Sequence, residues 1–217
     1  MEHFQTLYQD KDVLAIDKPA GVNADDFERR IHRLDKETSG ILLIAKNDQA
    51  LEFFQKQFKE RKVEKRYFAL VVGNLKYQKG TIETLIGRSP NDRRKQKVYL
   101  VGEPNSEGKR EAVTEYKVLT RLRQGFGGQE NYYTLIEVTP ETGRKHQIRC
   151  HLVYLGHPVA GDKMYGFKNQ PCPSDLKRQF LHAIYLKIKM PNEKIQEIRS
   201  PLPKDLQLVL DNLKMTN

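Results

Sequence analysis

The sequence is poor in cysteine and in long apolar runs, and these two absences exclude several kinds of protein. Cys150 and Cys172 are the only cysteines among 217 residues and form no C-x-x-C pair, which argues against a disulfide framework or a zinc ribbon. The longest aliphatic run, Ile41–Ala45, is far shorter than the roughly 20 residues of a membrane-spanning helix. Met1–Gln5 has neither the basic nor the apolar part of a signal peptide. We therefore expect a soluble cytoplasmic protein with no membrane partner.

The histidines do not suggest a metal site. His146 and His151 are five residues apart, whereas a spacing of four would put two ligands on one face of a helix. We expect no bound metal.

Acidic residues are outnumbered by basic ones. Lys and Arg together number 38, Asp and Glu number 28, and the net charge is +10. This balance favours a polyanionic partner, most often nucleic acid, although a surface that is basic only for solubility gives the same composition. Hydrophobic residues make up 38% of the chain, which is enough for one packed core, and we expect residues 1–217 to form a single domain.

The apolar pattern predicts more strands than helices. Strands are predicted at Val13–Ile16, Ile41–Ala45, Arg66–Val72, Ala112–Leu119, Tyr133–Val138 and Phe180–Met190. Helices are predicted from Asp48 onward, over Lys145–Leu155 and over Pro203–Leu213. The basic stretch from Arg88 to Arg110 has few strand signals, and Gln124–Gln129 is predicted as a flexible hairpin loop. The pattern indicates an α+β fold with a largely antiparallel mixed sheet and flanking helices.

Polar residues that could carry chemistry precede one of the predicted core strands. Asp35 lies in the segment His32–Gly40, which runs directly into the strand Ile41–Ala45. A carboxylate held rigidly at a sheet edge could serve as a nucleophile. A capping Asp in a charged loop fits the same spacing, and the spacing alone favours that interpretation.

A second such segment coincides with the predicted helix Lys145–Leu155. His146 and Arg149 are three residues apart and would share a face next to the apolar side of this helix. A buried Arg149 would need a carboxylate partner, for which Asp35 is a candidate. An amphipathic helix with a solvated basic flank explains the pattern equally well. The third segment, Lys65–Tyr67, is ordinary for the start of a strand when considered alone.

The order of these segments resembles the RluA-type family of RNA pseudouridine synthases. The resemblance rests on motifs that span about Val13 to Leu186: Lys18–Gly21, His32–Asp35 with Thr38–Gly40, Lys65–Tyr67, Gly143–Arg149 and Gly156–Asp162. The stretch Val22–Ile31 is shorter than is usual in this family, and the chain has no room for the small RNA-binding domain that often precedes the catalytic domain. The resemblance implies the pseudouridine synthase fold, with a central basic cleft.

The resemblance also implies a reaction and its residues. Uridine in RNA would be isomerised to pseudouridine, and the reaction would need no cofactor. The base is detached from its sugar, turned and rejoined through carbon. Asp35 matches the essential aspartate of the family, which acts on the anomeric carbon or helps to remove a ribose proton. Arg149 matches the position that keeps this carboxylate ionised, since a neighbouring guanidinium lowers a carboxylate pKa. Tyr67 matches the tyrosine that stacks on the uracil and is a candidate base for the final proton. Arg33 matches a residue thought to fill the space left by the flipped-out nucleotide.

Further residues are candidate contacts to a ribosomal or transfer RNA stem-loop. Within or beside the motifs these are His32, Arg144, His146 and Gln147, and the cluster Arg93, Arg94 and Lys95 could bind phosphates from a loop. We expect a monomer.

Two other classes of function are compatible with parts of the pattern: a non-catalytic RNA-binding module, and a nucleic-acid glycosylase or nuclease that uses Asp35. A non-catalytic RNA-binding module on the same fold would not need Asp35, Tyr67 and Arg149 together. A metal-dependent nuclease would need clustered carboxylates, whereas the motifs contain only Asp35, Glu37 and Glu141. A glycosylase that used Asp35 would release the base, whereas a synthase keeps the product in the RNA chain.

Overall fold

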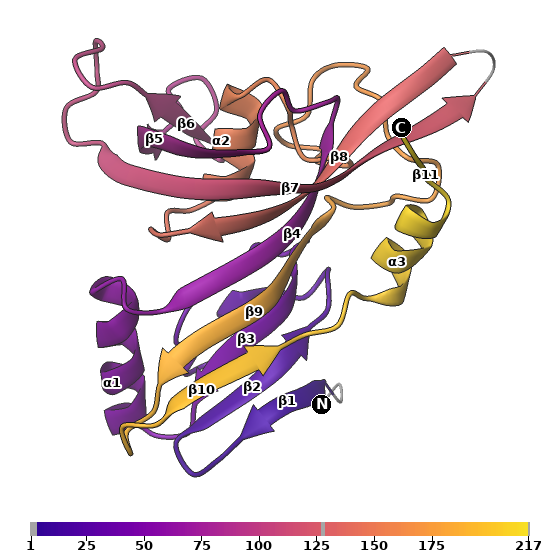
Figure 1. Cartoon of the computed structure of the whole chain (residues 1–217). Helices are drawn as coiled ribbons and strands as arrows, with labels where there is room; N and C mark the ends of the chain where they lie inside the picture. The colour runs from indigo at the N-terminus through magenta and orange to yellow at the C-terminus, as the bar shows by residue number, and fades with distance from the viewer. Residues whose placement is uncertain (1–3, 127–128, 217) are drawn as a thin grey trace. The chain divides into compact units, whose positions relative to one another are not determined.

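Strands dominate the fold, as a computed structural model of residues 4–126 and 129–216 shows (Figure 1). The chain divides into two units. The first unit comprises the described residues up to Tyr67 together with Leu181–Pro203, and the second comprises Phe68–Phe180 together with the described residues from Lys204. Strand β4 (Glu64–Val72) runs from the first unit into the second. A single domain over 1–217 stays a prediction.

The first unit is built on strands from both ends of its sequence. Its strands are β1 (Gln5–Gln9), β2 (Val13–Lys18), β3 (Ser39–Ala45), the start of β4, β9 (Leu181–Lys189) and β10 (Ile195–Arg199). β1, β2 and β3 pair antiparallel, β9 runs parallel to β3, and β10 is antiparallel to β9. A short 3-10 helix covers Ala24–Asp26.

One helix supplies part of the core of this unit. Helix α1 (Asp48–Lys59) starts where the Asn47 side chain accepts a hydrogen bond from the Ala50 backbone N–H at 2.8 Å. Its Phe54 is fully buried among β-strand residues such as Leu43 and Ile188. The opposite side of α1 carries exposed lysines, as the spacing in the sequence predicts.

The second unit contains a long hairpin and two helices. Its elements are the rest of β4, β5 (Lys79–Arg88), β6 (Gln96–Tyr99), β7 (Arg110–Phe126), β8 (Gln129–Pro140), α2 (Gln147–Tyr154), α3 (Lys204–Asp211) and β11 (Lys214–Met215). The strand order is β4-β8-β7-β5-β6, and β11 pairs with β7. In Figure 1 the β7–β8 hairpin is the longest feature of this unit.

The predicted α+β class with a mainly antiparallel sheet is confirmed, whereas two local predictions are wrong. The basic stretch after Arg88 contains β6. No strand is predicted over Lys79–Arg88, which forms β5 with buried Ile82, Thr84 and Ile86 alternating with Glu83, Leu85 and Gly87. Residues 124–126 continue β7 rather than form a loop, and residues 127–128 lie outside the described part. The helix predicted from about Lys145 to Leu155 is confirmed as α2, Gln147–Tyr154. The central basic cleft stays a prediction.

Among the helices that the structure describes, none is both long enough and apolar enough to cross a bilayer.

Candidate functional site

Asp35 lies in a tight turn just before β3. Its carbonyl oxygen accepts a hydrogen bond from the Thr38 backbone N–H at 3.0 Å. The side chain of Asp35 is half-buried, while Arg33 next to it is exposed. The turn leads directly into β3, whose residues are almost all buried. The core of the first unit therefore fixes the backbone next to Asp35.

A buried lysine supports this turn from the Lys18–Gly21 motif. Lys18 is fully buried, and its Nζ donates to the carbonyl oxygens of Pro19 at 2.8 Å, Val22 at 2.9 Å and Lys36 at 3.2 Å. The Gly21 backbone N–H donates to the same Lys36 oxygen at 2.9 Å. Three carbonyl dipoles stabilise the ammonium away from water, and the carbonyl group of Lys36, the residue after Asp35, is thereby fixed.

A buried histidine supports the other end of the turn. His182 of β9 is fully buried, with Nδ1 2.9 Å from Ser39 Oγ and Nε2 3.2 Å from Ser200 Oγ. Gly40 then packs so tightly on β9 that a Cβ would lie 2.3 Å from the Ala183 carbonyl oxygen, and its φ is +112°. Only glycine fits this position.

Tyr67, at the start of β4, is an electrostatic neighbour of Asp35. Burial and, after it, the charge of Asp35 raise the pKa of Tyr67 far above its ordinary value. The phenol is therefore protonated at neutral pH, and it can act as a base only if substrate binding changes its surroundings.

His32 has a structural position in the first unit. Its Nε2 accepts a hydrogen bond from the Leu43 backbone N–H at 3.2 Å, and its ring stacks on Phe58 at 4.8 Å between centroids. Burial and then the charge of Lys65 lower the pKa of His32 to about 3. The imidazole is neutral, so any contact of His32 with RNA would not be that of a cation.

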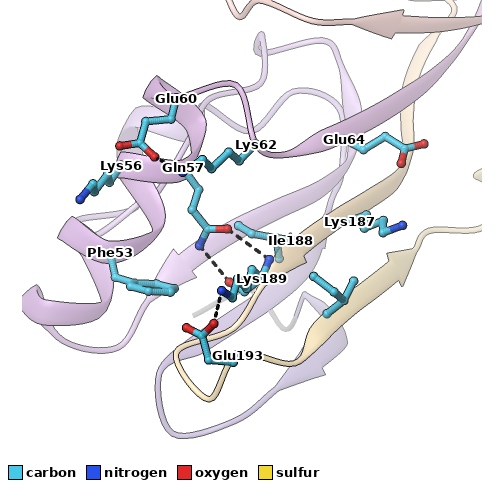
Figure 2. Close-up of a pocket in the computed structure, with 11 residues that line it drawn as sticks. Phe53, Lys56, Gln57, Glu60, Lys62, Glu64, Lys187, Ile188, Lys189 and Glu193 are labelled. Atoms are coloured by element: carbon cyan, nitrogen blue, oxygen red, sulfur yellow. Dashed lines mark hydrogen bonds and ion pairs between the residues drawn. The ribbon is translucent and has the colours of Figure 1, made fainter.

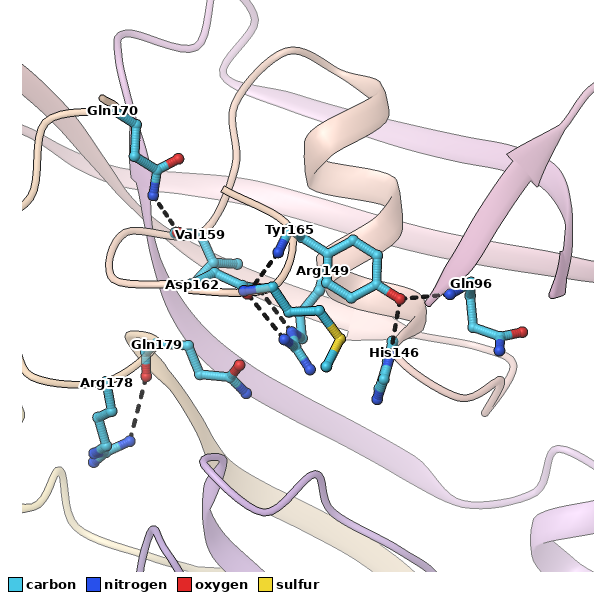
Figure 3. Close-up of polar contacts among 10 residues, drawn as sticks. Gln96, His146, Arg149, Val159, Asp162, Tyr165, Gln170, Arg178 and Gln179 are labelled. Carbon is cyan, nitrogen blue, oxygen red and sulfur yellow. Dashed lines mark hydrogen bonds and ion pairs between the residues drawn. The ribbon is translucent and has the colours of Figure 1, made fainter. Parts of the chain in front are cut away.

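Arg149 is buried in the second unit and bound to a carboxylate (Figure 3). Its Nε donates to Asp162 Oδ2 at 2.7 Å and its Nη2 to Oδ1 at 2.9 Å, while Oδ1 also accepts the backbone N–H groups of Met164 and Tyr165. Burial alone would raise the pKa of Asp162, but the hydrogen bonds and charge of Arg149 outweigh it and lower the pKa. The solvated basic flank considered for this helix is wrong, because α2 is buried from Gln147 to Leu152.

Tyr165 connects Arg149 with His146. The Arg149 guanidinium carbon lies 4.8 Å from the centre of the Tyr165 ring. The Tyr165 hydroxyl accepts the Gln96 backbone N–H at 2.7 Å and lies 2.8 Å from His146 Nδ1, as Figure 3 shows. His146 has a left-handed backbone, with φ of 55°, and caps α2 instead of belonging to it. The expectation that His146 and Arg149 share a helical face is therefore wrong.

Gln147 and Arg144 are held by β7 and its surroundings. The Gln147 amide oxygen accepts from Thr142 Oγ1 and the Arg144 backbone N–H, and its Nε2 donates to the Val113 carbonyl oxygen and lies 2.9 Å from Thr114 Oγ1. Arg144 Nε donates to the Glu111 carbonyl oxygen at 2.8 Å. A contact between Gln147 and RNA would have to displace one of these partners, and it stays a prediction.

The side chains of the three residues in the predicted phosphate cluster, Arg93, Arg94 and Lys95, have different surroundings in the structure. Arg94 Nε and Nη2 donate to the Asp92 carboxylate at 3.0 and 2.9 Å and lower the pKa of Asp92 to about 2. Lys95 Nζ lies 6.0 Å from the centre of the Tyr165 ring. Arg93 alone lines a cavity.

A different cavity, of about 470 Å³, lies in the first unit beside α1, β9 and β10 (Figure 2). Gln57 spans it by donating to the Lys189 carbonyl oxygen at 2.8 Å, and Lys189 pairs with Glu193. Lys62 pairs with Glu60 at 2.7 Å. None of the predicted site residues lines this cavity.

The predicted residues fall into two groups. His32, Arg33, Asp35 and Tyr67 belong to the first unit, and those from Arg93 to Arg149 belong to the second. An Asp35–Arg149 pair stays a prediction. Sequence reasoning assigned no role to Lys18, His182 or Asp162, although Lys18 and Asp162 belong to quoted motifs.

No metal site is evident in the described ranges, where no three His, Cys, Asp or Glu side chains are grouped as metal ligands.

Comparison with known proteins gives one consistent result. The sequence pattern of the RNA pseudouridylate synthase family matches residues 28–154. An uncharacterized RNA pseudouridine synthase of Chloroflexus aurantiacus is 44% identical over 85% of the chain and 53% of its own length. Ribosomal large subunit pseudouridine synthase C of Vibrio parahaemolyticus is 34% identical over 100% of the chain and 71% of its own length.

Solved structures agree with this result. Human RNA pseudouridylate synthase domain containing 1 has a TM-score of 0.82 and 30% identity, over 99% of this chain and 89% of that one. The chain spans about half the length of the Chloroflexus relative and seven tenths of the Vibrio one. The resemblance to RluA-type synthases, which the ordered motifs predict, is confirmed: the chain belongs to the RNA pseudouridylate synthase family.

Proposed function

We propose that this chain isomerises specific uridines of ribosomal or transfer RNA to pseudouridine, with Asp35 as the essential carboxylate and without a cofactor. The observation that carries the proposal is the position of Asp35, in a turn fixed by Lys18 and His182 and beside Tyr67. Membership of the family supports the reaction class. The Vibrio relative is named a ribosomal large subunit pseudouridine synthase, and this name supports ribosomal RNA as the substrate class.

Each residue has a distinct task in this proposal. The bond between uracil N1 and ribose C1′ breaks, a bond from C5 to C1′ forms, N1 gains a proton and C5 loses one, so the reaction is an isomerisation. Asp35 acts either on C1′ or on a ribose proton. Tyr67 stacks on the uracil through its ring. Only its phenolate, and not the protonated phenol of the free protein, could accept the C5 proton, so this role requires that Tyr67 first lose its own proton in the complex with substrate. Arg149, whose guanidinium is oriented by Asp162, is the proposed cationic partner of the Asp35 carboxylate in the reaction.

Substrate access requires a flipped nucleotide, because uracil inside a stacked helix cannot reach a side chain of the protein. The exposed Arg33 is proposed to occupy the vacated space. His146 and Arg144 are proposed to contact the RNA at the edges of the second unit. Such an enzyme is expected to work in the cytoplasm as a monomer.

The test is single-turnover formation of pseudouridine by Asp35→Asn at saturating enzyme. Loss of the charge and of the attacking oxygen should reduce the rate by orders of magnitude, while RNA affinity changes little because phosphate contacts supply most of it. Glu37→Gln is the matched control, since it makes the same change at an exposed carboxylate two residues away. A rate for Asp35→Asn within about tenfold of the parent, or roughly 1.4 kcal/mol in barrier, would refute the role of Asp35.

The same assay separates the alternatives. A non-catalytic RNA-binding module would bind RNA and form no product in the parent chain. A glycosylase would release free uracil, whereas a synthase leaves pseudouridine in the chain.

A further inference from the structure

A cavity of about 460 Å³ in the second unit is lined by cations. It lies against β5, β6 and the segment that leads from β6 to β7. Arg88, Arg93, Lys97 and Lys109 are its charged lining residues, and none of the described residues that line it is Asp or Glu. We call these four residues and the space between them the basic pocket.

The ring of Tyr99 fixes two of these cations. Lys97 Nζ and Lys109 Nζ each lie 5.1 Å from the centre of this ring. Tyr99 itself is buried, and its hydroxyl donates to the Arg88 carbonyl oxygen at 3.0 Å. Two ammonium groups are therefore held at a rigid ring that is anchored to the backbone of β5.

The path of the Lys109 side chain depends on the glycine at position 87, which has no side chain of its own. A Cβ on Gly87 would lie 2.2 Å from Lys109 Cδ. Gly87 is not one of the glycines with positive φ, so this position uses the absence of a side chain and not an unusual backbone. The stem of Lys109 crosses β5 at Gly87.

Several other described cations lie against a carboxylate, in contrast to the four residues of this pocket. Arg94 is bound by Asp92 through two hydrogen bonds. Of the lysines that line the cavity in Figure 2, Lys62 pairs with Glu60 and Lys189 with Glu193. Two like charges about 4 Å apart repel by roughly 1 kcal/mol in water and more where water is excluded. A bound anion would remove this repulsion in the basic pocket.

We propose that the basic pocket binds a phosphodiester group of the RNA substrate. The proposal rests on the proposed function, because that function supplies the polyanion. Guanidinium and ammonium groups together offer the several N–H donors that phosphate oxygens accept. The contact positions the RNA and does not read its sequence. The phosphate-binding cluster predicted from the sequence is thereby redefined: Arg93 is kept, and Arg94 and Lys95 are replaced by Arg88, Lys97 and Lys109.

The first experiment measures affinity for a fluorescent RNA substrate over a series of salt concentrations. Lys109→Ala should reduce affinity several-fold, and the slope of log K against log salt should become shallower by about 0.7 for the lost phosphate contact. Lys79→Ala is the matched control, because it removes the same charge from an exposed position at the opposite end of β5 from Arg88, and Lys79 does not line the pocket. Its slope should stay within experimental error of the parent.

The second variant, Gly87→Ala, changes no charge. The new methyl group would displace Lys109 from its path, so affinity and slope should move in the direction of Lys109→Ala while the melting temperature changes little. A parental affinity and slope for Gly87→Ala, or equal effects of Lys109→Ala and Lys79→Ala, would overturn the proposal in favour of diffuse surface charge.

Two further readouts separate the possible failures. The first readout is the melting temperature in millimolar inorganic phosphate at constant ionic strength. If phosphate raises it for the parent but not for Lys109→Ala, while Lys109→Ala binds RNA with parental affinity, the pocket binds free phosphate and the assignment to RNA is wrong. Pseudouridine formation by the parent tests the proposed function separately. If the parent forms no product but shows the predicted salt slopes, the proposed isomerase function is refuted while the binding of an RNA phosphate by the basic pocket is supported.

Discussion

Replacing Asp162 by Asn tests whether a buried ion pair orients Arg149. The two side chains are 7% and 0% exposed, and two hydrogen bonds of 2.7 and 2.9 Å join them. Asn preserves the size of the side chain but removes the charge and turns an N–H donor toward one of the Arg149 donors. Removal of one partner from a buried pair costs about 3–5 kcal/mol, which is a large part of the roughly 5–15 kcal/mol that stabilises a typical domain.

A half-exposed pair of the same kind provides the control. Arg178 donates to Asp205 through Nε at 2.7 Å and Nη2 at 3.2 Å, but the Asp205 side chain is 55% exposed. Solvent screening reduces the contribution of such a pair to about 0–1 kcal/mol. Asp205→Asn therefore makes the same chemical change in a bidentate pair. The two sites differ in the burial of the carboxylate and in the Met164 and Tyr165 backbone N–H groups that Asp162 also accepts.

Urea unfolding at neutral pH measures both variants, with pseudouridine formation followed on the same preparations. Asp162→Asn should lower the free energy of unfolding by several kcal/mol and also reduce turnover, because Arg149 loses its orientation. The low pKa of Asp162 in the folded chain means that the pair stabilises above the unfolded pKa of about 3.9 and loses this effect as the pH falls through the folded pKa. A loss no larger than that of Asp205→Asn would refute the reasoning.

Three further outcomes are expected. Gly40→Ala should destabilise the chain by more than about 1 kcal/mol in urea unfolding, because a Cβ would lie 2.3 Å from the Ala183 carbonyl oxygen; an unchanged midpoint would contradict the close packing of β3 on β9. Burial lowers the pKa of His151 to about 4, below the value of about 6.5 in the unfolded chain. The free energy of unfolding should therefore fall by up to about 3 kcal/mol between pH 6.5 and 4. Unfolding of the parent and of His151→Gln at pH 7 and 5 measures this loss, and equal pH responses of the two chains would contradict it. Tyr67→Phe should fold and bind RNA but form little product, since the ring is kept and the hydroxyl is lost; near-normal turnover would leave Tyr67 with stacking alone.

Much of the fold could be predicted from the sequence because local signals and the final structure agree. The helix predicted from Asp48 onward is α1, which starts at that residue, and the apolar run Ile41–Ala45 forms most of the buried strand β3. The failures have a common cause. β5 contains two threonines, two glycines and three charged residues among its ten, so its apolar signal is weak, and its pairing with β7 stabilises it from outside its own sequence.

The site could be predicted only as far as its motifs extend. The turn at Asp35 and the position of Tyr67 follow from their motifs, but the partners of buried groups depend on contacts over long sequence distances. His182 reaches Ser39 across more than 140 residues. The pairing of Arg149 with Asp162 was missed because a carboxylate thirteen residues away gives no helical spacing signal. The division of Arg93, Arg94 and Lys95 among three surroundings arises from the loop conformation, which composition does not encode.

The division of the first unit between two distant parts of the chain has a consequence for synthesis on the ribosome. Its main apolar cluster combines residues such as Val13, Leu43 and Phe54 with Leu186, Ile188 and Ile198. A nascent chain that has emerged only as far as the end of β8 holds the first set without the second, so apolar surface of β2, β3 and α1 is left uncovered while the second unit is being made. Contacts over such separations form slowly, and uncovered strands aggregate easily. We expect nascent chains that end before β9 to associate with general chaperones, and release from them to coincide with the emergence of β10.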